Sequence, residues 1–202
     1  WDPVENASFI PWLVGTALLH SAIVVEKRDA LQSWTILLAL LTFSMSLLGT
    51  FLVRSGVLTS VHTFASDPDR GIFLLVLLIF VTGGSLILYA IRAPNLPGGG
   101  LFSPISREGA LVFNNLLLTT AATVVILGTL YPLILDALGG GKVSVGPPFY
   151  KATFIPLMFP VLIACVVGAM LSWKRADLKG VLDRLKLALF VTIIVTVTTA
   201  YL

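Results

Sequence analysis

The chain has 202 residues, of which 57% are hydrophobic and 11% are charged. Soluble globular domains carry about 25% charged residues, and a soluble protein this apolar would lack the polar groups to cover its surface. The composition excludes an ordinary cytosolic enzyme, a disordered chain and a disulfide-rich scaffold, and it indicates an integral membrane protein. The net charge of +3 is too small and too scattered to predict nucleic-acid binding. A single cysteine, Cys165, excludes an internal disulfide.

The two ends of the chain predict that it is a piece of a longer protein. It begins at Trp1 with no methionine, and it stops at Leu202 within an apolar stretch. No signal peptide precedes the first apolar stretch.

Six apolar segments are long enough, or nearly so, to cross a membrane, which takes roughly 20 mostly apolar residues. Every Lys, Arg, Asp and Glu lies between these segments or at their edges. The sequence therefore predicts an all-α fold, a polytopic integral membrane helical bundle with about six transmembrane helices, the last one truncated. The predicted spans are 8–25, 33–53, 71–91, 110–135, 153–173 and the segment from 187 onward.

The connections between the spans have the composition of loops. Residues 26–29 are charged, residues 92–109 contain prolines and three consecutive glycines, and residues 136–152 again combine glycines with prolines. The run 98–100 has neither GxGxxG nor Walker spacing and predicts no nucleotide site. For 136–152 the sequence indicates no chemistry, and we expect a loop with at most short structure that contacts partners.

The distribution of Lys and Arg predicts an orientation, because cytoplasmic loops carry an excess of both. One set of loops is rich in them, and it is expected to be cytoplasmic. The N-terminus and the segments 54–70 and 136–152 then face outward, which in a bacterium means the periplasm. The richer set holds Lys27, Arg28, Arg92, Arg107, Lys174, Arg175, Lys179, Arg184 and Lys186, and the poorer set holds Arg54, Arg70, Lys142 and Lys151.

His20 is a polar residue inside the first predicted span. It lies about 12 residues into the span, which at 1.5 Å per residue is about 18 Å and past the midplane. It is either a neutral histidine hydrogen-bonded to a neighbouring helix, or an axial ligand to a membrane-embedded heme. Such a heme usually needs a second axial ligand, and no other histidine of this chain lies in a predicted span.

His62 lies in the outward segment 54–70. Apolar residues at helical spacing over 57–65 predict a short amphipathic helix in the membrane interface, with His62 at the border of its apolar face. It is either a partly solvated surface histidine or a ligand for an amphipathic, iron-containing group at the membrane surface. The flanking Arg54 and Arg70 are either partners for carboxylates such as heme propionates or snorkelling anchors at helix ends.

The opening string WDPVEN places a tryptophan, two carboxylates and an amide directly above a span. One interpretation is an interfacial aromatic residue followed by helix caps, with Ser8 capping the first helix and Asp2 and Glu5 at the positive end of its dipole. This interpretation accounts for the acids but not for the whole string.

Two long strings resemble a known family. WDPVENASFIPWLVGTALLHSA is similar to the end of the tryptophan-rich WWD segment of heme-handling membrane proteins and the helix after it. LLGTFLVRSGVLTSVHTFASDPDRG resembles one branch, the CcmF family of bacterial System I cytochrome c maturation, and FNNLLLTTAATVVILGTLYP supports the resemblance further. The related heme exporter CcmC also has a WWD segment, but GTFLVRSGVLTSVH is not expected there.

This resemblance implies a function, an enzyme class and partners. It implies a heme lyase or synthetase component that accepts heme from the periplasmic heme chaperone CcmE and promotes its covalent attachment to apocytochrome c. The apocytochrome is handled with thioreduction partners such as CcmH. The implied location is the lipid bilayer of the bacterial inner membrane, with Trp1 and His62 on the periplasmic side.

The resemblance also implies roles for single residues. His20 matches a ligand of an internal b-type heme, so heme b is the expected cofactor, and His62 matches a periplasmic histidine that ligates the delivered heme. Trp1 and Asp2 match the end of the WWD segment, which would occupy residues 1–7. The second histidine of each pair has no counterpart in this chain, and no catalytic residue is assigned.

Two other functions remain open on the sequence. One is a multi-span transporter of heme or a small solute, and the other is a non-catalytic membrane scaffold of an assembly complex. No charged group lies mid-span, although transport sites often use one. Only the glycines 83–84 and the prolines within 156–160 hint at the discontinuous helices of transporters.

Overall fold

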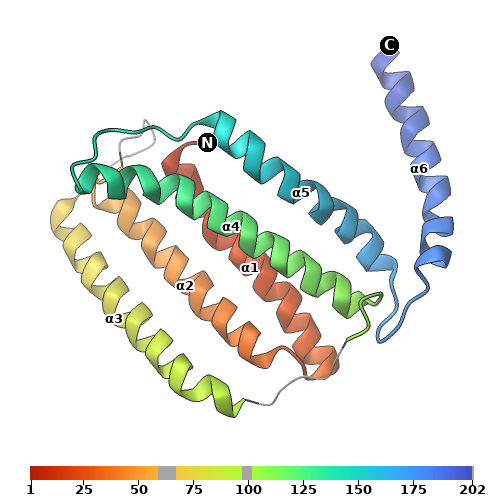
Figure 1. Ribbon diagram of the computed structural model, residues 1–202, viewed down its shortest axis with the longest axis horizontal. Helices are drawn as coiled ribbons and strands as arrows, with labels where there is room; N and C mark the ends of the chain where they lie inside the picture. The colour runs from red at the N-terminus through yellow and green to blue at the C-terminus, as the bar shows by residue number, and fades with distance from the viewer. Residues whose placement is uncertain (59–66, 97–101, 202) are drawn as a thin grey trace.

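The computed structural model describes residues 1–58, 67–96 and 102–201, and within these ranges every regular element is helical (Figure 1). The elements are α1 (Pro3–Arg28), α2 (Gln32–Arg54), α3 (Pro68–Arg92), the 3-10 turn η1 (Ala93–Asn95), α4 (Arg107–Ala137), α5 (Pro147–Met170) and α6 (Leu178–Tyr201). This confirms the predicted all-α fold.

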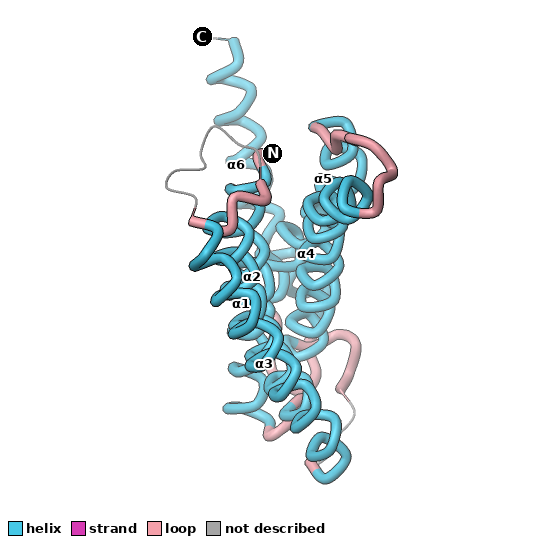
Figure 2. The backbone as a smooth tube through the Cα atoms, turned by 90° about the vertical axis from the view of Figure 1, so that its left-hand side faces the viewer, coloured by secondary structure: helices cyan, strands magenta, loops and turns pink. Residues whose placement is uncertain are grey.

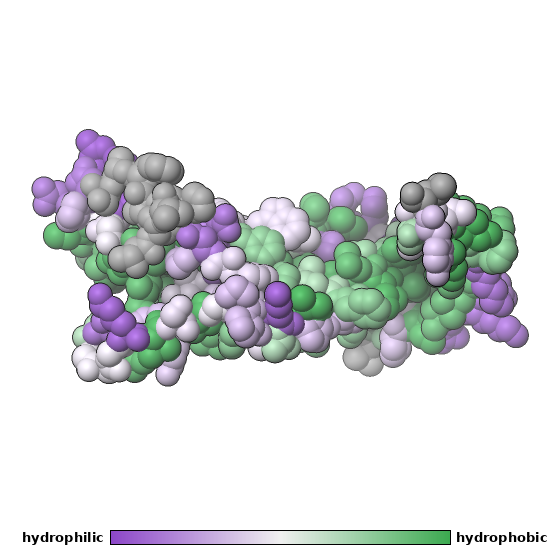
Figure 3. Space-filling model, turned by 90° about the horizontal axis from the view of Figure 1, so that it is seen from above, coloured by the Kyte–Doolittle hydropathy of each residue, from purple (hydrophilic) through white to green (hydrophobic). Residues whose placement is uncertain are grey.

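Five of the described helices, α1 to α5, are long and apolar enough to cross a membrane. In Figure 3 the hydrophilic residues gather mainly toward the two ends of the molecule, and hydrophobic residues make up most of the middle. α6 is not among the candidate spans. Its first part carries Lys179, Asp183, Arg184 and Lys186, so the apolar part begins only at Leu187. The sequence had predicted a sixth, truncated span there.

Proline and capping chemistry explain where two helices begin. α1 begins at Pro3, and its N-cap is Asp2, whose Oδ1 accepts a hydrogen bond from the Val4 amide at 2.8 Å. Ser8 is therefore not the cap that the sequence predicted. α5 begins at Pro147. Proline is tolerated in the first helical turn, because the backbone N–H that it lacks would have no hydrogen-bond partner within the helix there. The predicted loop 136–152 is thereby reduced to the irregular segment 138–146.

The suspected helix breaks are absent from the described helices α3 and α5. α3 runs without interruption through Gly83 and Gly84, and α5 runs through Pro156 and Pro160. Neighbouring helices in a membrane protein can compensate for the backbone groups that a proline leaves unpaired. The one structural hint of a transporter in the sequence is therefore not supported.

Helix packing gives the spatial order α3, α2, α1, α4, α5, because α1 packs against both α2 and α4, α2 packs against α3, and α4 packs against α5 (Figure 1). α1 is central and contributes the core residues Ile10, Leu13, Val14 and Ala17. α6 makes a small contact with α5 and projects away from the bundle in Figures 1 and 2.

Small residues bring the central helices close together. A Cβ atom on Gly49 of α2 would lie 2.6 Å from the backbone oxygen of Ala7 on α1. Gly168 of α5 faces the Ala110 side chain of α4, which would lie 3.0 Å from an added Cβ. Membrane helices associate through such contacts, since lipid provides no hydrophobic force between them.

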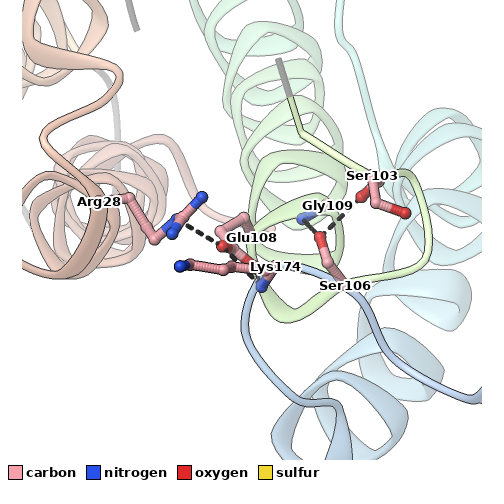
Figure 4. A network of polar contacts seen from close by, with 6 residues as sticks. All are labelled: Arg28, Ser103, Ser106, Glu108, Gly109 and Lys174. Carbon is pink, nitrogen blue, oxygen red and sulfur yellow. Dashed lines mark hydrogen bonds and ion pairs between the residues drawn. The ribbon is translucent and has the colours of Figure 1, made fainter. Parts of the chain in front are cut away.

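The bundle has two ends, named here for one residue each. The Trp1 end holds the start of α1, the end of α2 and the start of α5, and the Glu108 end holds the end of α1 and the start of α4. At the Glu108 end, Arg28 and the Lys174 amide converge on the Glu108 carboxylate, and Ser106 caps α4 by accepting from the Gly109 amide at 3.0 Å (Figure 4).

Candidate functional site

Aromatic stacking fixes the first residue of the chain against α5. The Trp1 indole lies parallel to the Tyr150 ring, with centroids 4.2 Å apart and planes 3° apart, and meets Phe154 edge-on at 5.1 Å. Tyr150 is buried, whereas Trp1 remains 42% exposed. The predicted site residue Trp1 is therefore immobilised on one face and accessible elsewhere.

A hydrogen-bond cluster holds Tyr150 in place beneath Trp1. The buried Asn6 donates from Nδ2 to the Tyr150 hydroxyl and to Thr129 Oγ1, each at 3.1 Å. Gly128 makes room for the ring, because a Cβ atom there would lie 2.6 Å from the Tyr150 hydroxyl. The amide of the WDPVEN string thus ties α1 to α4 and α5.

A pocket of about 630 Å³ opens beside Trp1. Its aromatic lining also includes Phe9 and Trp12, whose rings stack at 5.6 Å, and its polar lining includes Glu5 and Ser8. A flat apolar ligand with polar edges would find both aromatic surface and polar groups here. We call this cavity the Trp1 pocket.

A second pocket, of about 620 Å³, lies between α1 and α2 on the other side of Glu5 and Ser8. Arg54, the last residue of α2, lines it. Arg70 lines neither pocket; it pairs with Asp67 at 3.1 Å, and its side chain is 70% exposed. The structure therefore brings Arg54 close to the Trp1 pocket and gives Arg70 a local partner.

His62 and most of the predicted amphipathic helix 57–65 lie outside the described residues. The two ends of their segment are nevertheless joined, because the Asp67 amide donates to the Arg54 carbonyl at 2.9 Å. Gly71 packs closely against Ser55, with an added Cβ only 2.8 Å from the Ser55 Cα atom. The described residues on either side of this segment therefore lie together at the Trp1 end.

His20 lines a pocket of about 350 Å³ between α1, α4 and α5, toward the Glu108 end. We call it the His20 pocket. Ile23, Leu111, Ala110 and Ala164 give it apolar walls. On α4, Asn115 faces His20 and also hydrogen-bonds Ser21 at 2.6 Å. The described residues contain no group of three His, Cys, Asp or Glu side chains that could hold a metal ion.

These features fit a heme held through a single protein nitrogen. Imidazole is a common axial ligand of heme iron, and the apolar walls suit the macrocycle. The pocket also contains the buried Asn114, whose Oδ1 has no hydrogen-bond partner among the described residues. Such an atom in a ligand-sized cavity is expected to meet a polar group of a ligand.

Sequence reasoning missed several residues that line these pockets or support their walls. Phe9 and Trp12 face the Trp1 pocket from one side of α1, and their spacing of three residues on a helix was a usable signal. Tyr150, Arg107 and Trp173 had no such signal, because the chain brings them to the sites from distant helices and connections.

Known proteins of cytochrome c biogenesis are similar to this chain in sequence and in fold. The sequence profile described as "Cytochrome C assembly protein" matches residues 1–59. The cytochrome c-type biogenesis protein CycK of Rhizobium meliloti is 63% identical over 92% of this chain, and CcmF of Escherichia coli is 48% identical over all of it. A solved structure named cytochrome c heme lyase CcmF superimposes on 88% of the chain with a TM-score of 0.65 and 37% identity.

The chain belongs to the CcmF/CycK family. It spans 27% of the length of the Rhizobium CycK protein, 31% of the E. coli CcmF protein and 25% of the solved CcmF chain. The family profile covers α1 and α2, which hold the first CcmF-like string and the start of the second. The match to E. coli CcmF continues through α4 and α5, which carry the rest of the His20 pocket.

Proposed function

We propose that this chain is the part of a CcmF-type protein that binds heme during cytochrome c maturation. The observation that carries the proposal is the pairing of an aromatic pocket at the Trp1 end with a histidine-lined pocket deeper in the same bundle. The relatives named for cytochrome c-type biogenesis, and the structure named for heme lyase activity, support the assignment.

In this proposal the Trp1 end receives the substrate heme. Heme supplies the iron, and the vinyl groups that form thioether bonds with apocytochrome thiols; the protein supplies binding and orientation. Trp1 and Trp12 present apolar surface, while Tyr150 and Asn6 fix the orientation of Trp1. His62 would bind the iron, and Arg54 would pair with a propionate.

The partners follow from the same assignment. Heme would arrive from the chaperone CcmE, and apocytochrome c would be presented with the help of thioreduction subunits such as CcmH. The protein would lie in the bacterial inner membrane, with the Trp1 end in the periplasm. The enzyme class is cytochrome c heme lyase, acting within a complex.

His20 would hold a resident heme b in the second pocket. Its ring faces Asn115, and a histidine that ligates a metal usually keeps its orientation through a hydrogen bond at its other nitrogen. The second axial ligand would come from outside the 202 residues, because this chain has only two histidines and the proposal assigns the other one, His62, to the delivered heme.

The test uses the full-length protein purified in detergent. His20→Ala is expected to abolish the b-type heme spectrum, and Arg175→Ala, at the exposed α5–α6 connection, is the control that should retain it. Wild-type heme content in His20→Ala would reject the ligand assignment. For His62→Ala, the readouts are the yield of holocytochrome c and the amount of heme trapped on the chaperone.

A transporter or a non-catalytic scaffold predicts a different result. Neither needs a resident heme, so a full-length protein purified without any heme would favour one of them. The uninterrupted α3 and α5 already remove the helix breaks that the transporter interpretation used.

A further inference from the structure

The His20 pocket has a polar side, formed by Arg107 and Asn114. Both line the same cavity as His20, and Arg107 is the first residue of α4, at the Glu108 end. The remaining walls are mostly apolar or small. Arg107 thus approaches the pocket from the Glu108 end, and Asn114 lies about two turns further into α4.

Arg107 is held rigidly but lacks a negatively charged partner. Its Nε donates to the Leu171 carbonyl at 2.9 Å and its Nη2 donates to the Ala169 carbonyl at 2.7 Å. The guanidinium also lies over the Trp173 ring, 5.4 Å from its centroid. Among the described residues no carboxylate forms an ion pair with it.

This arrangement differs from that of the neighbouring Arg28. Arg28 is compensated by the Glu108 carboxylate at 2.8 Å, although the two arginines lie at the same end of the bundle. At Arg107 the carbonyls of the last turn of α5 occupy two donors, and Nη1 remains unassigned. An arginine fixed in this way offers a preorganised cation with a donor available for a carboxylate.

Asn114 supplies the second, independent observation. The side chain is 3% exposed, its Nδ2 donates only to Cys165 Sγ at 3.4 Å, and its Oδ1 has no partner among the described residues. A buried amide oxygen without a hydrogen bond destabilises the protein unless a ligand satisfies it. A carboxylate only accepts hydrogen bonds, so Asn114 recognises one with its amide turned, which directs Nδ2 into the pocket and Oδ1 toward the Cys165 thiol.

We propose that Arg107 and Asn114 form the carboxylate subsite of the His20 pocket and bind the propionates of the porphyrin whose iron His20 ligates. The porphyrin would then be oriented with its carboxylates toward the Glu108 end and its apolar edge toward the bundle centre. This inference rests on the proposed function, because it takes a heme on His20 as given. It assigns a binding role to residues outside the two CcmF-like strings that carry His20 and His62.

The test compares heme with its dimethyl ester, which keeps the iron and the apolar ring but has no charged propionates. Both are titrated into full-length protein produced without heme, and binding is followed by the absorbance spectrum in detergent. Wild-type protein is expected to prefer free-acid heme. Arg107→Met is expected to weaken free-acid binding about tenfold, which corresponds to about 1.4 kcal/mol, and to abolish the preference over the ester.

Two further variants separate binding from folding. Asn114→Leu keeps the size of the side chain and should reduce the same preference by a smaller factor. Arg175→Met removes an arginine from the same end of the bundle but outside the pocket, and it should leave both affinities unchanged. If Arg107→Met does not fold, as judged by gel filtration in detergent, the Asn114→Leu result decides.

The outcomes distinguish the possible errors. The subsite is overturned if Arg107→Met keeps the wild-type preference for free-acid heme over the ester. Where Arg107→Met fails to fold, the same result in Asn114→Leu overturns it. Loss of co-purified anionic phospholipid from Arg107→Met with the preference intact would show that the arginine binds a lipid phosphate instead. If His20→Ala still gives the b-type heme spectrum with heme or with its ester, the proposed ligand role of His20 is rejected. If only the subsite is wrong, His20→Ala loses that spectrum with both compounds.

Discussion

Glu108 on α4 forms an ion pair with Arg28 on α1, with 2.8 Å between Oε1 and Nε, although only 1% of the Glu108 side chain is exposed (Figure 4). Both of its carboxylate oxygens also accept the Lys174 amide at 3.0 Å. Lys174 has a positive φ of 70°, a conformation that this contact helps to hold. One buried carboxylate thus joins α1, α4 and the connection to α6.

Removing that carboxylate should destabilise the bundle. Glu108→Ala leaves Arg28 and the Lys174 amide without their acceptor, and breaking one partner of a buried pair costs on the order of 3 kcal/mol. The measurement is thermal unfolding of the full-length protein in detergent. Glu26→Ala is the matched control, because its pair with Lys27 is exposed and should contribute less than about 1 kcal/mol. Equal melting temperatures for the two variants would contradict the prediction.

Gly128→Ala should disturb the base of the Trp1 pocket. The new Cβ would lie 2.6 Å from the Tyr150 hydroxyl, so Tyr150 must move away from Asn6 and Trp1. Such overpacking typically costs about 1–3 kcal/mol. The expected results are a lower melting temperature and a reduced yield of holocytochrome c. Gly83→Ala is the control, since nothing lies within 4 Å of its added Cβ.

Gly49→Ala tests the contact between α1 and α2. Its Cβ would lie 2.6 Å from the Ala7 backbone oxygen, and a backbone atom cannot turn aside as a side chain can. Alanine in a helix interior is otherwise favoured over glycine by about 1 kcal/mol. Gly84→Ala on α3 has open space and should gain or keep stability, whereas Gly49→Ala should lose it. The comparison fails if both variants change stability in the same direction.

Trp12→Ala should weaken binding of the delivered heme at the Trp1 end. The side chain is 58% exposed and lines the Trp1 pocket, so its removal takes away apolar ligand surface with little effect on the core. Less trapped heme and less holocytochrome c are expected. Phe43→Ala, which removes a similarly exposed aromatic residue from α2, should behave like wild type. An equal loss in both variants would indicate a general effect of surface aromatics.

Cysteine labelling in intact cells tests the orientation. Lys142→Cys, in the segment between α4 and α5, should react with a membrane-impermeant maleimide from the periplasm. Lys179→Cys, near the start of α6, should react only after the inner membrane is permeabilised. The reverse pattern would invert the topology and place the Trp1 pocket in the cytoplasm.

Much of the helix layout follows from the sequence, for a local reason. Apolar runs of membrane-spanning length must become helices, because no other single segment satisfies its backbone hydrogen bonds in lipid. The spans α1 to α4 accordingly begin and end within a few residues of their predicted limits. α5 deviates more, because Pro147 starts the helix although proline composition suggested a loop. The largest deviation is α6, where the helix already begins at Leu178 and its charged first part precedes the apolar stretch predicted from 187.

By itself, the sequence determined that the chain lies in a membrane, that its charges are sorted between two faces, and that His20 is placed inside a span. Only the tertiary structure decided which distant residues surround these features. Trp1 stacks on Tyr150, Glu108 meets Arg28, and Arg107 joins the His20 pocket. Helical periodicity fixes only which residues three and four positions apart lie side by side. The contacts between distant residues depend on which helices pack together and at what depth. Small residues and buried polar groups at the helix interfaces decide that packing.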